Sequence, residues 1–518
     1  LTTSGVTGFT TAEIAALGTV QISGLTSAQV GALSTPQLGA LSSNQLGALT
    51  TAAEIGLSTD DVVALTTAQL TGMTSAQVAA LTTVQLGALS SAQLAVLTSA
   101  ALTGLTTAEI NALTQAQISG LTSNQVAALS TTQLGALSSA QISALTTGAV
   151  GGLTTLDMAA LKTAQIAGLT SDQVAALSTS QIRALSSTQI GALPTAAEAG
   201  LSSDDIASLT SAQIVGLTSA QIDALNLTQL GALSPSQIGA LTTAAEAGLS
   251  RLDLVSLTSA QIAGLTSAQV GALTTSQLNA LSASQVGALT TMAEAGLTST
   301  QIAALTTGQI VGLTSAQAGA LTTIQLGALS SAQIGALTLA AQAGLTTIEV
   351  AALTTAQIAG LTSAQIGALT PAQLGAIASS KIAAVTPSAI TGLTLGEVAL
   401  LTSAQISGLT SAQVDALSTM QIGALASNQL AALTTSAQSG LSGADIAALT
   451  LAQISGLTSA QVGALNLSQL GALSAGQLGA LTSAAASGLS TAEIAALTPT
   501  QIKGLTATQV GAFSTTQI

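Results

Sequence analysis

The sequence has 518 residues, and its 19 acidic and 5 basic side chains give a formal net charge of −14 at pH 7. This charge opposes binding to nucleic acid or to an anionic membrane surface, and no Tyr or Trp is present on which bases would stack. His and Cys are also absent, which excludes disulfide bonds, zinc sites built from these residues and a nucleophile activated by His. We therefore expect no enzyme, no catalytic residues and no cofactor.

Charged residues make up only 5% of the sequence, against roughly 25% in ordinary soluble domains. The surface must then consist mostly of Thr, Ser, Gln, Ala and Gly, and such a surface can pack closely against copies of itself. The mean hydropathy is positive, but a polar residue interrupts the sequence every few positions and no run of about 18 apolar residues occurs. We predict no membrane span.

An eight-residue motif, the octad, starts at Leu1 and repeats to the end of the sequence without a change of register. Its consensus is L-[TS]-[TS]-A-Q-[ILV]-[GA]-[AG], as in residues 361–368. Thr or Ser at position two is a typical helix N-cap, and Gln three residues later completes a capping box. Leu361 and Ile366 then stand at the two positions that form a hydrophobic staple across the cap. The first position is apolar throughout and departs from Leu at Phe9, Met73, Ile377, Val385 and Phe513.

Each octad therefore predicts one helix of about six residues. So short a helix is unstable alone, and we predict an all-α repeat solenoid, a superhelix in which the Leu and Ile side chains of neighbouring octads stack. The six prolines agree, because all lie in the first half of an octad, where a helix tolerates them. A β-solenoid is the alternative, favoured by the abundant Thr and Gly, although apolar positions one and six would point to opposite faces of a strand.

A second period of 48 residues, or six octads, divides this single continuous array over residues 1–518 into ten full units (1–480) and a partial unit (481–518). We expect one 48-residue unit to form one superhelical turn. The first octad of each unit departs from the consensus, and we interpret it as a corner. In several of these octads the polar partner stands one place later, which predicts displaced capping boxes from Thr51 to Glu54, Thr195 to Glu198, Thr243 to Glu246, Thr291 to Glu294 and Thr435 to Gln438.

Gly recurs at the end of the third octad of each unit, as at Gly72 and Gly120, which indicates a close backbone approach or a positive φ. The second octad usually carries an acid at position five, where the capping box and the helix dipole both favour a carboxylate. The alternative is a ladder of cation sites along the axis, with the candidate residues Asp61, Asp157, Asp205, Asp253 and Glu349. Ca²⁺ takes six to eight oxygens, so carbonyl groups or neighbouring chains would have to complete each site.

The basic residues share no octad position. Lys381 replaces a position-five Gln and Lys162 replaces an N-cap, and we interpret both as drift on an exposed surface. The five basic residues are Lys162, Arg183, Arg251, Lys381 and Lys503.

The L-T-x-x-Q-I-x-A octad resembles repeats of very long secreted or cell-surface proteins of bacteria, of the adhesin and extracellular-filament kind, over essentially the whole chain. This resemblance implies an extracellular or cell-surface setting. The octad is also similar to the repeats of the short-helix superhelix in the magnesium-transporter regulatory domain and the flagellar motor switch protein, which share a Leu, a capping residue and a polar residue near the third helical position. That similarity implies the fold alone.

We therefore expect a structural protein that assembles with copies of itself into an extracellular filament or tube or a cell-surface fibre. The alternative is an adhesive or ligand-presenting rod, including an ice-binding one, whose ranks of Thr match a lattice. Exposed Thr and Ser are candidate sites for O-linked glycans. Because the sequence starts without Met or a signal peptide and stops inside an octad, we expect a processed chain or a segment of a longer one.

Overall fold

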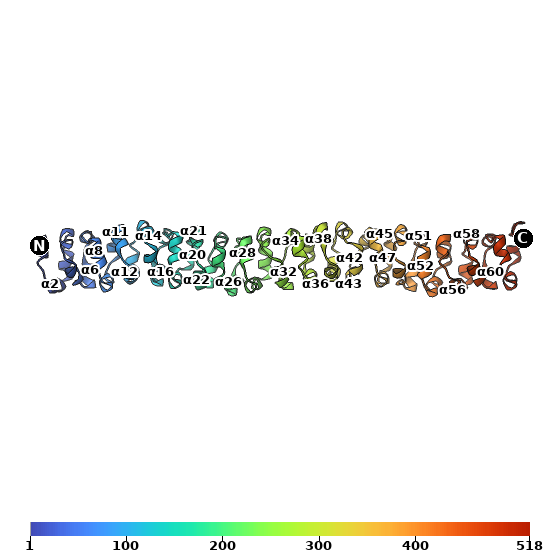
Figure 1. The fold of residues 1–518 in the computed structure, drawn as a ribbon, viewed down its shortest axis with the longest axis horizontal. Coiled ribbons are helices and arrows are strands. Elements are labelled where there is room, and N and C mark those ends of the chain that lie inside the picture. Colours follow the sequence, from blue (N-terminus) through green and yellow to red (C-terminus); the bar gives the residue numbers. More distant parts are fainter. Residues whose placement is uncertain (1) are drawn as a thin grey trace. The chain divides into compact units, whose positions relative to one another are not determined.

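The computed structural model describes residues 2–518, which contain 64 α-helices and no strand. The chain forms two compact units, Leu1–Gly264 with helices α1–α33 and Leu265–Ile518 with helices α34–α64. Within each unit the short helices follow one another in a regular succession of turns (Figure 1). The predicted all-α solenoid is confirmed, and the β-solenoid alternative is wrong.

Every helix begins at position three of its octad and contains four to six residues. In the first unit, residues 49–96 form α7 (Thr51–Glu54), α8 (Thr59–Ala64), α9 (Thr67–Leu70), α10 (Ser75–Ala80), α11 (Thr83–Ala88) and α12 (Ser91–Val96). In the second unit, residues 337–384 form α43 (Leu339–Gln342), α44 (Thr347–Ala352), α45 (Thr355–Ile358), α46 (Ser363–Ile366), α47 (Pro371–Ala376) and α48 (Ser379–Ile382).

The capping box starts most of these helices, as the sequence predicts. At α9 the Gln69 N–H donates to Thr66 Oγ1 at 3.3 Å, and the Thr66 N–H donates to Gln69 Oε1 at 2.9 Å. The first-position residue of the next octad then ends a helix by adopting an extended conformation, as Leu81 does after α10 with φ −61° and ψ 136°. Each octad thus encodes both the start of its own helix and the end of the one before.

The core consists of the side chains at positions one and six. Val78 and Leu81 are 0% and 4% exposed, and most of their counterparts are buried, except towards the two ends of the described chain, as at Ile502 with 51% exposure. Neither side chain has partners enough within its own octad, so burial depends on the octads stacked above and below. Since burying a Leu or Ile side chain stabilises by roughly 1.5–3 kcal/mol, this stacking compensates for the instability of the isolated helices.

One superhelical turn contains three octads, or 24 residues, because each helix packs against the third helix along the chain. For example, α7 packs on α10, and α9 packs on α12. The predicted turn of six octads is therefore wrong. The 48-residue period instead corresponds to two turns.

Glycine distinguishes the two turns of each pair. A Cβ on Gly56 would lie 2.0 Å from the Ser27 carbonyl oxygen, and one on Gly72 would lie 1.9 Å from that of Ser43. One turn later, 24 residues on, these positions carry Ala80 and Val96, whose side chains require a wider junction. The predicted close approach is confirmed, whereas a positive φ is wrong, because no glycine among the described residues has one. Close and wider junctions alternate, which gives the period of 48 residues.

Candidate functional site: polar contacts between turns

Glutamine at position five joins each turn to the previous one. Gln69 Nε2 donates to the carbonyl oxygens of Leu38 at 2.7 Å and Leu41 at 2.9 Å. The Leu38 carbonyl lies at the end of α5 (Thr35–Gly39), where it also accepts from the Leu41 N–H at 3.1 Å, and the Leu41 carbonyl lies just before α6 (Ser43–Ala48). The Gln69 side chain, 4% exposed, therefore caps its own helix with Oε1 and satisfies the previous turn with Nε2.

We call this repeated set of contacts the glutamine ladder. In the second unit Gln365, 2% exposed, donates to the carbonyl oxygens of Ile334 at 2.8 Å and Leu337 at 3.0 Å. The capping box alone accepts Glu as readily as Gln. The predominance of Gln at position five is explained by the second contact, because only the amide offers an N–H donor to a carbonyl group.

The five candidates for a cation ladder all lie in capping boxes. Asp157 Oδ2 accepts from the Thr154 N–H at 2.8 Å, and Glu349 Oε2 accepts from the Thr346 N–H at 2.6 Å. Asp61, Asp205 and Asp253 accept in the same way from the N–H of the N-cap serine. Successive candidates are at least 48 residues apart in the chain. Among residues 2–518, no three acidic side chains are grouped closely enough to hold a metal ion.

The glutamates predicted to form displaced capping boxes are buried in the core instead. Thr50, not Thr51, is the N-cap of α7, and its Oγ1 accepts from the Ala53 N–H at 3.2 Å. The predicted capping box from Thr51 to Glu54 is wrong because the helix starts one residue earlier than that box requires. With Thr50 as the N-cap, the third helical residue is Ala53, and Glu54 is the fourth. Glu54 therefore falls at position six, which is apolar in nearly every other octad.

Four glutamates share this core position: Glu54, Glu198, Glu246 and Glu294. Each is at most 2% exposed. Both carboxyl oxygens of Glu198, Glu246 and Glu294, and Oε2 of Glu54, are buried without a hydrogen-bond partner. Burial raises the pKa of Glu54 and Glu198 to about 8 and that of Glu246 and Glu294 to about 7.

Glutamine occupies the same core position at two places in the second unit. Gln342 Nε2 donates to the Gln365 carbonyl oxygen at 2.7 Å, and Gln438 Nε2 donates to that of Gln461 at 2.8 Å. Both Oε1 atoms are buried without a partner. The signal for these six sites was present in the sequence, because an apolar position carries Glu or Gln, but the capping-box interpretation obscured it.

Two lysines also bond the previous turn. Lys381 Nζ donates to the Ala351 carbonyl oxygen at 2.6 Å, and Lys162 Nζ donates to that of Gly135 at 2.8 Å. Lys381 stands where the glutamine ladder has an amide, so its ammonium group supplies the missing donor. These contacts were not expected from residues interpreted as surface drift.

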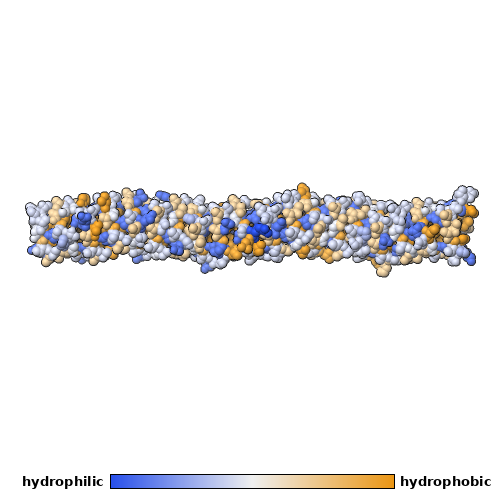
Figure 2. Space-filling model, viewed as in Figure 1, coloured by the Kyte–Doolittle hydropathy of each residue, from blue (hydrophilic) through white to orange (hydrophobic). Residues whose placement is uncertain are grey.

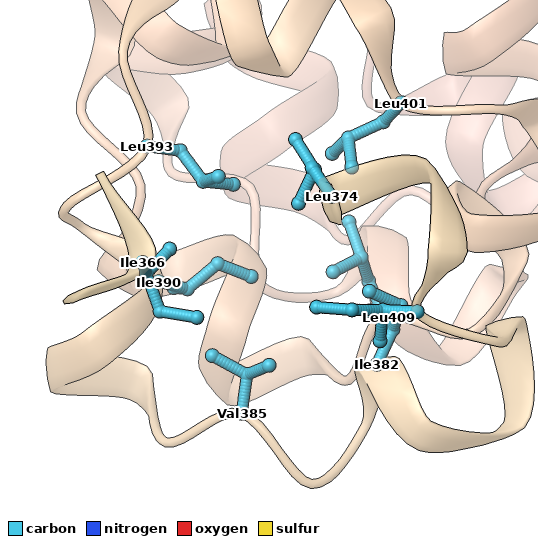
Figure 3. A pocket seen from close by; sticks show the side chains of 9 residues that line it. Ile366, Leu374, Ile382, Val385, Ile390, Leu393, Leu401 and Leu409 are labelled. Carbon is cyan, nitrogen blue, oxygen red and sulfur yellow. The ribbon is translucent and has the colours of Figure 1, made fainter. Parts of the chain in front are cut away.

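An apolar cavity of about 10 Å³ lies in the core of the second unit where the first-position Leu is lost twice in succession, at Ile377 and Val385. The side chains of Ile366, Leu374 and Ile390 point into the same space from three different helices (Figure 3). This volume is at the lower limit for one water molecule, and the lining has no polar group to hold one. We interpret the cavity as a packing defect.

The helices are too short to cross a membrane, since none among the described residues exceeds six residues.

Comparison with known proteins identifies the repeat. The sequence model of the ALTTAQ repeat matches residues 1–35, 55–91, 120–155, 150–187, 174–203, 199–235, 211–243, 247–283, 255–291 and 343–379, together more than half of the chain. No curated protein matches the sequence. A solved structure, the leucine-rich repeat-containing protein LegL7 from Legionella pneumophila, is 14% identical over 51% of this chain and 79% of that chain. Its TM-score of 0.14 is too low to inform the fold.

Proposed function

The chain belongs to the ALTTAQ repeat family, and we propose that this repeat scaffold is a structural protein that assembles with copies of itself into an extracellular filament, tube or cell-surface fibre. We propose in addition that it catalyses no reaction. The family match and the regular stack of short helices support a scaffold. The extracellular setting rests on the resemblance of the octad to secreted bacterial repeats.

The glutamine ladder is the observation on which the proposal mainly rests. The amides at position five are consumed in holding one turn to the next, as those of Gln69 and Gln365 are. Most of the surface is left to small, uncharged residues, and Figure 2 accordingly shows a face dominated by pale, intermediate colours. The position-five amides are hydrogen-bonded within the chain, and few charged side chains are on the surface. Such a surface is suited to packing against identical copies.

Exposed apolar side chains add a contact surface for a second copy. Ile324 and Ile348 are 76% and 72% exposed, and both stand at position four of their octads. They lie on neighbouring turns, since α41 (Thr323–Gly327) packs on α44. Helices that pack on one another in successive turns form a row along the stack. We propose that these two residues contact the corresponding row of helices in a neighbouring chain. Isolated exposed apolar residues are normal, but an aligned pair favours association.

Electron microscopy at near-native concentration tests the proposal. We expect continuous fibres from the wild type and fewer or shorter fibres from the double variant Ile324→Ser, Ile348→Ser. Met292→Ser is the matched control, because Met292 is 81% exposed at position four but belongs to a different row of helices, so fibres should persist. Dispersed single molecules of the wild type would contradict self-assembly.

A ligand-presenting or ice-binding rod is the competing proposal. The position-two hydroxyls are engaged, since Thr66 Oγ1 accepts from Gln69 N and donates to Gln69 Oε1 at 3.0 Å. The position-three hydroxyls, which the capping boxes do not use, are then the most regular candidates for a lattice or for O-linked glycans. Thermal hysteresis of a solution of the chain would favour the rod, and a measured mass above the bare 49.6 kDa would reveal glycans.

A further inference from the structure

In the first octad of several 48-residue units, core position six carries a polar side chain. This side chain is the amide of a Gln in two units and the carboxyl group of a Glu in others. We propose that Glu54, Glu198 and Glu294 are neutral carboxylic acids that donate to a main-chain carbonyl of the next turn, so that a rise in pH loosens the stack at these turns. This inference is independent of the proposed self-assembly.

The geometry comes from the two glutamines at this position. Gln342 and Gln438 each donate from Nε2 to the carbonyl oxygen 23 residues later, at 2.7 and 2.8 Å. These two side chains are 2% and 1% exposed, so no bulk water competes for the acceptor. Core position six therefore lies beside one buried carbonyl acceptor, which a side-chain donor at this position can bond.

The glutamates face the same acceptor in the same register. The residue 23 positions after each is again a position-five Gln of the next turn: Gln77 for Glu54, Gln221 for Glu198 and Gln317 for Glu294. The helices pair in the same way, because α43 packs on α46 as α7 packs on α10. Likewise, α25 (Thr195–Glu198) packs on α28 (Ser219–Ala224), and α37 (Thr291–Glu294) packs on α40 (Ser315–Ala318).

An ionised carboxylate cannot satisfy this acceptor. A carboxylate has only acceptor atoms, and so has the carbonyl group, whereas a protonated carboxyl donates one O–H as the amide donates one N–H. Both oxygens of Glu198 and Glu294 are buried without a partner. Leaving a charge in that state is far more costly than binding a proton. Glu246 occupies the same position and also has two unpartnered oxygens.

No opposite charge is present to hold the ionised form. The helices packed against α7 are α4 (Ser27–Val30) and α10, and neither contains a titratable residue. The same is true of α34 (Ser267–Ala272) and α40, which flank α37. Next to α25, the only titratable groups on the flanking helices are Asp172 and Asp223, which are exposed and carry the same sign.

The nearest acids along the chain are also of the same sign. Asp60 and Asp61 follow Glu54 on α8, and Asp204 and Asp205 follow Glu198 on α26 (Ser203–Ser208). Asp61 and Asp205 are engaged in capping boxes with the preceding serine. No cation therefore competes with protonation, in agreement with a pKa of about 8 for Glu54 and Glu198 and about 7 for Glu294.

Amide hydrogen exchange of the full chain between pH 5 and pH 9 tests the inference. The quantity is the ratio of the opening equilibrium constant of residues 193–200, which contain Glu198, to that of residues 337–344, which contain Gln342. The intrinsic pH dependence of exchange is the same for both segments and cancels in the ratio. One proton bound in the folded state and released on opening predicts a tenfold rise per pH unit above the unfolded pKa of 4.5, levelling off near pH 8.

Two variants of the full chain make the test specific. Glu198→Gln should remove the rise at residues 193–200 and leave that at residues 49–56 unchanged. Glu349→Gln, which alters a capping-box acid, should leave the pH dependence of all the ratios unchanged. In infrared spectra at pH 6 the wild type should also show the C=O stretch of protonated carboxyl groups, weakened in Glu198→Gln. A ratio that stays constant from pH 5 to pH 9, or the absence of that band, would overturn the inference.

Discussion

Helix α25 in the first unit and helix α43 in the second unit end in different side chains at the same core position. Both contain four residues, and both are followed by a Gly whose position abuts a serine of the previous turn: Gly200 against Ser171 and Gly344 against Ser315. At position six, Glu198 has two carboxyl oxygens without partners, whereas Gln342 donates to the Gln365 carbonyl at 2.7 Å.

This difference shows that backbone packing and side-chain hydrogen bonding make separate demands on the junction between turns. The backbone demand is for the absence of a side chain at the Gly. The hydrogen-bond demand is for one donor at position six, which Gln meets at every pH and Glu meets only when protonated.

The largest expected effect comes from the close backbone approach that both junctions share. A Cβ on Gly344 would lie 1.9 Å from the Ser315 carbonyl oxygen, so Gly344→Ala must push two turns apart. We expect a loss of about 3 kcal/mol or more in the local free energy of opening, measured by hydrogen exchange. Gly327→Ala is the control, because a Cβ there has no neighbour within 4 Å, and removing a helical Gly should stabilise slightly. Equal losses from the two substitutions would contradict the close-approach argument.

The substitution Gln342→Glu should give the junction at α43 the pH dependence that we expect of the Glu198 junction at α25. At pH 5 the new carboxyl is protonated and donates, so stability should change little. Since a folded-state pKa raised above the unfolded value means that folding binds a proton, stability must fall as pH rises towards the folded pKa. We expect a loss of about 2–3 kcal/mol between pH 5 and pH 7, at about 1.4 kcal/mol per pH unit. Unfolding followed at both pH values checks this, and a loss independent of pH would contradict it.

A third change separates the two roles of the position-five amide. In Gln213→Glu the capping box with Thr210 is retained, but the donors to the carbonyl oxygens of Ile182 at 3.0 Å and Leu185 at 2.8 Å are lost. We expect a loss of about 1–2 kcal/mol at pH 7 in chemical unfolding. Glu493→Gln is the reciprocal variant and should not destabilise. If Gln213→Glu were neutral, the ladder would contribute nothing beyond capping.

The smallest expected effect concerns the cavity next to Val385. Val385→Ile adds one methyl group to a space lined by Leu393 and Leu401 and should raise the unfolding free energy by about 0.5–1 kcal/mol. Thermal unfolding measures this gain. The same substitution at Val398, which is fully buried away from the cavity lining, should instead be neutral or destabilising.

The helix starts could be predicted because every partner in a capping box lies within three residues, as Thr66 and Gln69 do. The three-octad turn could not, because an eight-residue pattern does not state the angle between successive helices, and the 48-residue period marks alternating junctions instead of a turn. The second contact of Gln69 was missed because its acceptors are 28 and 31 residues away. Glu54 was misplaced because its octad also fits a shifted capping motif.

The glutamine ladder also has a direction, which bears on how the chain folds. The ladder amides reach back 28 to 31 residues, as Gln365 does to Leu337 and Ile334, so their acceptors are made before them during synthesis. The sequence separation of these contacts stays constant however many repeats are added, and loop closure does not become costlier with length. The stack can therefore form one turn at a time as the chain is synthesised, with each finished turn serving as the template for the next.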